Sequence, residues 1–116
     1  MPTVYTDSYR KVHSLVIAIT TKPSDSLQLN SDNERILSVL IVAPAVLTGT
    51  VNLQFSLDDV TWENLQIDGG SSIAIAAETA QIIRWLPGVG YIRLNSGSNE
   101  AAARTFSVVA LATGVR

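Results

Sequence analysis

Apolar and polar residues alternate most regularly between Thr50 and Leu57, in the segment TVNLQFSL. Successive side chains of an extended strand point to opposite faces, so this alternation predicts a half-buried strand. One face would pack into a core and the other would meet solvent. The core-facing positions are Val51, Leu53, Phe55 and Leu57, and the outward positions are Asn52, Gln54 and Ser56.

Similar short apolar segments recur along the chain, separated by turn residues such as Asp58-Asp59 and Pro87-Gly88. Val, Ile and Thr are abundant, and their branched side chains favour strands over helices. About eight or nine short strands with regular turn signals predict an all-β fold, a β-sandwich or barrel. The other predicted strands are 12–20, 27–29, 35–43, 60–67, 71–76, 81–86, 91–95 and 104–112. Only 98–104 suggests helix, as a single turn with a Glu100–Arg104 pair.

A chain of 116 residues has the length of one domain. Residues 12–116 are predicted to form the sandwich, and residues 1–11 an N-terminal arm or an edge strand. The predicted core consists of apolar residues on the inward positions of the strands. These are Val51, Leu53, Phe55, Ile73, Ile75, Ile92, Leu94, Phe106 and Val108.

The first eleven residues lack a clear strand pattern and carry two tyrosines and an arginine, types enriched where proteins meet. We therefore expect this segment to contact another polypeptide, such as another subunit of an assembly. Val4, Tyr5 and Tyr9 would be the apolar anchors and Arg10 the polar contact. The alternative is an edge strand of the domain's own sheet.

Charged residues make up only 16% of the chain, against about 25% in a typical globular protein. Either part of the surface is covered by another molecule, or Ser, Thr, Asn and Gln cover a small β-domain. The net charge of −2 argues against nucleic acid as a partner. No apolar run is long enough to cross a membrane, and the first residues do not resemble a secretory signal.

The sequence offers little for catalysis or for metal binding. It has no cysteine and one histidine, His13, which is expected to be a structural residue with its hydrogen bonds satisfied. Asp58, Asp59, Glu63 and Asp68 lie around two turns, but their spacing matches no calcium loop, and Asp is common at turns. We expect no enzyme activity, no metal and no cofactor.

The two tryptophans lead to different expectations. Trp62 is predicted to be a core residue that closes one end of the sandwich. Trp85, Tyr91 and Arg93 lie on either side of the Pro87-Gly88 turn. If exposed, these three could stack on a sugar ring or contact a protein; the alternative is that they pack in the core.

The segment Gly49–Leu65, GTVNLQFSLDDVTWENL, is similar to a pattern in small β-sandwich proteins of tailed-bacteriophage virions. In that pattern a strand G-x-V-x-L-Q-x-S is followed by an Asp-rich turn and T-W-x-x-L. The later segments YIRL, from Tyr91, and RTFSV, from Arg104, resemble its last strands. The resemblance covers roughly residues 49–110 and carries no catalytic or binding motif.

What this resemblance implies is a jelly-roll or Ig-like sandwich that decorates and stabilises an icosahedral shell. The major capsid protein would then be the partner, the virion surface the location, and a homodimer or homotrimer the form that gains avidity. A minor tail or collar component is also compatible with the resemblance. Alternatives from other classes are a carbohydrate-binding module and an adhesion module.

Overall fold

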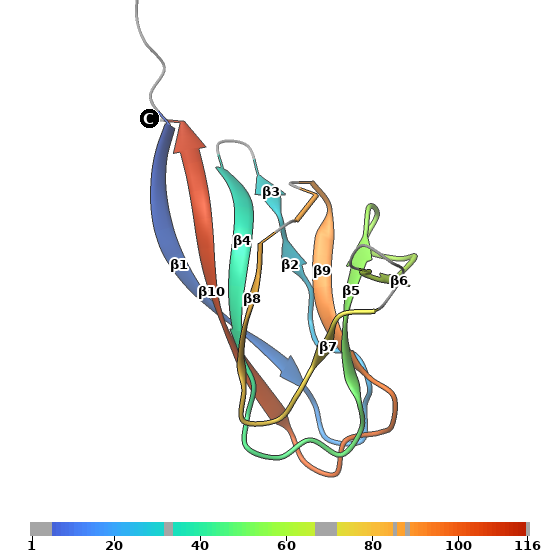
Figure 1. Ribbon diagram of the computed structural model, residues 1–116. Helices are drawn as coiled ribbons and strands as arrows, with labels where there is room; N and C mark the ends of the chain where they lie inside the picture. The colour runs from blue at the N-terminus through green and yellow to red at the C-terminus, as the bar shows by residue number, and fades with distance from the viewer. Residues whose placement is uncertain (1–5, 32–33, 67–71, 85, 88, 116) are drawn as a thin grey trace, which may run out of the picture.

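The computed structural model describes residues 6–31, 34–66, 72–84, 86–87 and 89–115, and these form ten β-strands in two antiparallel sheets. The first sheet lies to the left in Figure 1 and the second to the right. The first sheet contains β1 (Thr6–Ile17), β10 (Arg104–Val115), β4 (Glu34–Val42), β8 (Ala80–Ile83) and β3 (Asn30–Ser31). The second contains β2 (Leu27–Gln28), β9 (Tyr91–Ser96), β5 (Val51–Ser56), β6 (Glu63–Asn64) and β7 (Ala74–Ile75).

The strand order is that of a jelly roll. When the short strands β3 and β6 are left out, each sheet has four strands. The sheet with the order β1-β10-β4-β8 packs against the sheet with the order β2-β9-β5-β7. The chain passes repeatedly from one sheet to the other, as the two Greek keys of a jelly roll require. This confirms the predicted all-β sandwich, and the strand order selects the jelly roll over the Ig-like alternative.

Leu29 marks one of the crossings between the sheets, and it is fully buried. Its N–H donates to the carbonyl of Gly90 at 2.7 Å, beside the second sheet. Its own carbonyl accepts from the N–H of Ile36 in β4, also at 2.7 Å. The backbone at the corner is therefore satisfied by both sheets, as a buried peptide requires.

The core lies between the sheets and is almost entirely aliphatic. Eight of the nine predicted core residues are buried: Val51, Leu53, Ile73, Ile75, Ile92, Leu94, Phe106 and Val108. Phe55 is only partly buried and packs against the edge of this core. Leu57, predicted to face inward, is 72% exposed because β5 ends at Ser56 and the turn begins there.

The predicted boundaries differ most at the start of the chain. Residues 6–11 form the first half of β1, which pairs with β10 without a break from Thr6 to Ile17. The structure therefore has these residues as an edge strand of the domain's own sheet, one of the two alternatives for this segment. Contact between this strand and another polypeptide stays a prediction.

The segment 98–104 contains no helix, in contrast to the single turn that its sequence predicts. Its Glu100–Arg104 pair does form, with 2.9 Å between Oε1 and Nε, but in a loop that leads into β10. The Glu100 side chain is buried there, so tertiary contacts outweigh the weak local preference for helix.

Candidate functional site

The outer face of the first sheet carries a row of apolar residues that crosses four strands. Val12 of β1 pairs with Val109 of β10, and Val109 in turn pairs with Leu40 of β4. Leu40 pairs with Ile82 of β8. Residues in register have side chains on the same face, so the four form one continuous row. Its two ends are well exposed, Val12 at 70% and Ile82 at 59%.

Further apolar residues widen this row along the strands. Val42 and Leu111 lie two residues from Leu40 and Val109, Val16 lies four residues from Val12, and each is 38–40% exposed. The positions that separate these apolar residues along the strands carry serines rather than charged residues. Ser14 of β1 pairs with Ser107 of β10, which in turn pairs with Val42 of β4. We call this surface the outer apolar face, made of Val12, Val16, Leu40, Val42, Ile82, Val109 and Leu111.

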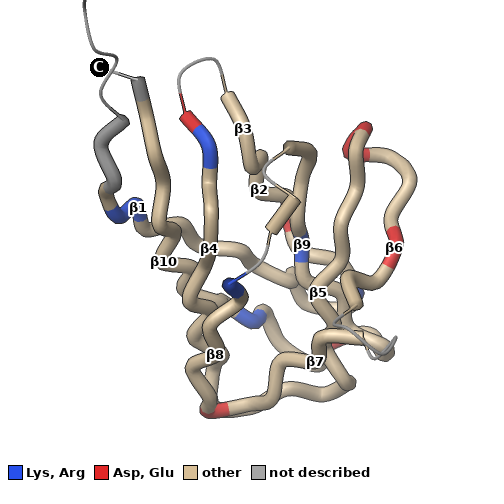
Figure 2. The backbone as a smooth tube through the Cα atoms, turned by 45° about the horizontal axis from the view of Figure 1, so that its top comes forward, with Lys and Arg blue, Asp and Glu red and all other residues tan. Residues whose placement is uncertain are grey.

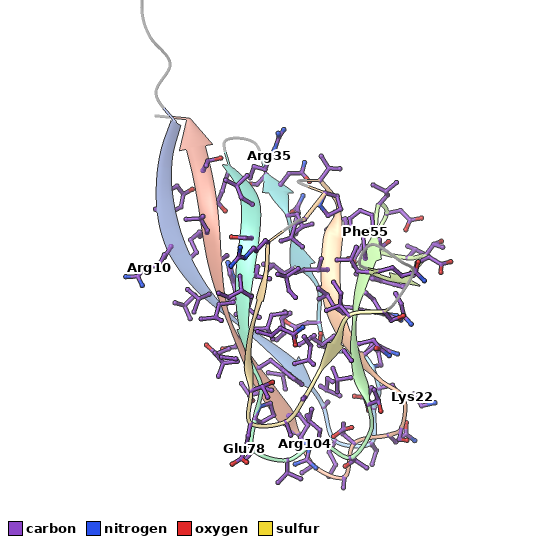
Figure 3. All side chains as sticks on the ribbon, in the orientation of Figure 1. Arg10, Lys22, Arg35, Phe55, Glu78 and Arg104 are labelled. Atoms are coloured by element: carbon purple, nitrogen blue, oxygen red, sulfur yellow. The ribbon has the colours of Figure 1, made fainter. Side chains whose placement is uncertain are left out.

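Arginines flank one end of the outer apolar face. Arg10 pairs in register with Leu111, and Arg35 pairs with Thr113, two positions further along β10. Arg84 directly follows β8 and is exposed, as the other two are. Figure 2 shows these basic positions on β1, at the start of β4 and after β8, and Figure 3 shows Arg10 and Arg35 extending away from the ribbon. Within the described ranges, none of the three forms an ion pair.

A β-bulge in β4 keeps a carboxylate off this face. Ser38 pairs with Leu111 but Ile36 pairs with Ala112, so Leu37 is an extra residue. The bulge reverses the alternation, and Ile36 is buried on the inner side. Glu34 lies on that side too, where it accepts hydrogen bonds from the Tyr9 hydroxyl and from Lys11 Nζ. The Tyr9 hydroxyl and Lys11 lower the pKa of Glu34.

The outer face of the second sheet is polar instead. Asn52 and Gln54 of β5 pair with Asn95 and Arg93 of β9. Arg93 Nε donates to Gln54 Oε1 at 2.8 Å, and the Gln54 amide donates to Asn64 at 3.1 Å. The Arg93 guanidinium also lies 4.3 Å from the ring centre of Trp62, a cation–π geometry. Burial lowers the pKa of Arg93, and this outweighs the charge of Asp59, which acts to raise that pKa.

Trp62 therefore differs from its prediction. It is half-buried on this polar face and does not belong to the core. The Arg93 guanidinium lies over the ring and gives the indole a partner on this face. The sequence contained both residues, but no local pattern could show that β9 lies beside the turn that carries Trp62.

Tyr9 and Arg10, both expected at a partner interface, are neighbours on β1, so their side chains point to opposite faces of the sheet. Tyr9 is partly buried on the inner side with Glu34, whereas Arg10 is exposed. Val4, Tyr5 and Trp85 lie outside the described residues. Tyr91 and Arg93 do lie together on β9, with Tyr91 half-buried beside Gln28 of β2.

Asp58 has a structural role in the turn after β5. Asp58 accepts hydrogen bonds from the backbone N–H groups of Thr61 and Val60 and from the Ser56 hydroxyl, which lower its pKa to about 2. This is the turn geometry expected of that aspartate. His13 was expected to have its hydrogen bonds satisfied, but its Nε2 is buried without a partner. No group of three potential metal ligands occurs among the described residues, nor any helix able to span a membrane.

No protein-family model matches the chain, and no curated protein matches it. The surfaces described above therefore carry the functional argument: an apolar face with arginines at one end, and a polar face whose side chains bind one another.

Proposed function

We propose that this protein is a non-enzymatic structural component of a virus particle, a decoration protein that attaches to the outside of the shell. The attachment surface is the outer apolar face of the first sheet, and the partner is the major capsid protein. The resemblance of residues 49–110 to phage virion sandwiches supports the class of protein. Jelly rolls also occur in lectins, so the fold alone does not indicate the function, and a specific surface must.

The observation that carries the proposal is the row formed by Val12, Val109, Leu40 and Ile82 across four strands. Single exposed apolar side chains are ordinary on protein surfaces, but a contiguous apolar patch marks an interaction site. Fully burying an exposed side chain of this kind is worth about 1.5–3 kcal/mol, so the two most exposed members, Val12 and Ile82, would contribute most to docking. The arginines at its end favour a partner surface that is apolar and bears carboxylates.

The test uses shells of the major capsid protein from the same virus, prepared without this protein. We expect the natural chain to co-sediment with them and Ile82→Lys to bind at least tenfold more weakly. Val60→Lys is the matched control, because Val60 is 77% exposed but lies in a turn of the second sheet. Equal binding by the two variants would remove the outer apolar face from the proposal. Binding to tails instead of shells would favour a tail or collar component.

Saccharide binding is the second candidate, favoured by the Trp62–Arg93 stack among amide side chains on the second sheet. It is the weaker candidate because these groups already bind one another, and Arg93 covers one side of the Trp62 ring. A glycan-array signal that Trp62→Ala abolishes would support it. Absence of any signal for the natural chain would remove it.

A further inference from the structure

We infer that two copies of this chain associate edge to edge through β1, so that their first sheets join into one continuous antiparallel sheet. The pairing itself does not depend on attachment to a capsid. It rests on the length and regularity of this edge, on the direction of its backbone groups and on the charges that a two-fold axis brings together.

The length of β1 distinguishes it from every other edge in the described part of the structure. Its outer side has no neighbouring strand over most of its twelve residues. The other edges are formed by β2, β3, β6, β7 and β8, which are two to four residues long. Short strands are one way in which proteins protect their sheet edges, and β1 lacks that protection.

The backbone of β1 presents its free groups in a regular series. The N–H of Val16 points away from β10, because it donates to the carboxylate of Asp25 at 2.9 Å. Successive residues in an antiparallel pair alternate in direction, so the N–H and C=O of Ser14, Val12 and Arg10 point outward as well. Among the described residues, no other segment forms a hydrogen bond with the outward N–H and C=O groups of Ser14, Val12 and Arg10. Register with β10 is unbroken, so no bulge twists this edge away.

Asp25 limits where a partner strand can pair. It occupies the edge at Val16, and the neighbouring Ile17 is bridged to Ser24. The open part therefore runs from Ser14 towards the N-terminus. A second β1 fits there around a two-fold axis at Val12, with Arg10 of each copy opposite Ser14 of the other. Each of these pairs exchanges two backbone hydrogen bonds.

This register avoids a like-charge pair that one neighbouring register would create. With the axis at Lys11, the two Lys11 side chains would lie directly opposite each other, an unfavourable like-charge pair. With the axis at Val12, each Lys11 instead lies opposite His13. The Lys11 ammonium is already paired with Glu34 at 3.0 Å within its own chain. The arginines are then separated, each facing a serine.

The pairing would also extend the outer apolar face. Val12 ends the apolar row, so Val12 of one copy would lie beside Val12 of the other. The two rows would then run across eight strands in one plane. This consequence rests on the proposed function: a dimer attaching through both faces would gain avidity over a single copy.

Light scattering on the full chain over a range of concentrations is the first test, and it should report a dimer. Ser14→Pro should raise the dimer Kd at least tenfold, because it removes an outward donor at each end of the seam. β10 does not use that N–H, so the variant should keep its β-sheet spectrum. Ser14→Ala keeps the N–H and should remain dimeric. A monomer at every concentration, or a trimer, would overturn the inference.

A cysteine scan tests the axis without depending on how Ser14→Pro folds. The chain has no cysteine, so any disulfide formed by a single-cysteine variant must join two copies. Val12→Cys places two sulfurs at the axis, where paired Cα atoms are close enough for a disulfide. It should oxidise to a linked dimer at least tenfold faster than Val60→Cys. Equal rates would contradict the pairing. Ile82→Lys should leave the dimer intact while it weakens shell binding, so the two proposals can fail separately.

Discussion

The carboxylate of Glu100 lies 2.9 Å from the backbone nitrogen of Gly49, although 51 residues separate them in sequence. It also accepts from the N–H of Thr48 at 2.8 Å, from the Ser96 hydroxyl at 2.6 Å and from Arg104 Nε at 2.9 Å. With 1% of its surface exposed, Glu100 joins the loop before β5, the end of β9 and the start of β10. A buried carboxylate is stable only when it is paired and hydrogen-bonded, as this one is.

Replacing Glu100 by glutamine should destabilise the protein by about 3 kcal/mol. The amide removes the charge that faces Arg104, and its NH2 group meets backbone donors where an acceptor is needed. Chemical denaturation of the purified variant measures the change. Glu78→Gln is the control, since Glu78 is exposed in the loop before β8, and it should change the unfolding free energy by less than about 0.5 kcal/mol. Equal effects would show that the buried carboxylate is not a stabilising contact.

Acid should destabilise the protein through two carboxylates in particular. Burial acts to raise the pKa of Glu100, but hydrogen bonds from Ser96, Thr48, Gly49 and Arg104 prevail and lower it from 4.5 to about 2. The pKa of Asp58 falls from 3.8 to about 2 because backbone N–H groups bind it. Folding lowers both values, so the stabilisation is complete above about pH 5 and is lost as the pH falls towards 2.

Urea unfolding between pH 2.5 and pH 7 measures this dependence. The unfolding free energy of the natural protein should rise with pH up to about pH 5 and then level off. The double variant Glu100→Gln, Asp58→Asn should show a much smaller rise. An identical pH dependence for both proteins would contradict the assignment of these two groups.

The two phenylalanines should differ in their contribution to stability. Phe106 is fully buried, and Phe106→Ala should cost about 3–5 kcal/mol through lost burial and a cavity. Phe55 lies at the edge of the core, so Phe55→Ala should cost clearly less, about 1–3 kcal/mol. Parallel denaturation curves compare them. A larger loss at Phe55 would place the centre of the core nearer the turn that follows β5.

Gly90 should not tolerate a side chain. Its φ of +89° lies in the region that glycine favours, and a Cβ there would meet the Ser56 carbonyl at 2.5 Å and Phe55 Cε1 at 2.9 Å. Gly90→Ala should lower the unfolding free energy by more than about 1 kcal/mol. Gly97→Ala is the control, because its nearest contact would be the Thr50 carbonyl at 3.6 Å. A melting temperature unchanged in both variants would show that the corner at Gly90 can relax.

Sequence alone determined the elements whose signals are local. The alternation from Thr50 onward placed Val51 and Leu53 in the core, because a period of two needs only neighbouring residues to be recognised. Asp58 was expected at a turn for a similarly local reason, since its side chain binds the backbone two and three residues later. An all-β sandwich with an aliphatic core follows from repeating such signals along the chain.

Tertiary structure decided everything that depends on register between distant segments. Residues 6–11 belong to β1 because β10, at the other end of the chain, pairs with them, although their sequence shows no strand pattern by itself. The bulge at Leu37 turns Glu34 inward and Arg35 outward, which a strictly alternating strand would reverse. Trp62 stacks with Arg93 of β9, and Glu100 binds groups from other parts of the chain. These contacts join residues far apart in sequence, so no window of neighbouring residues contains them.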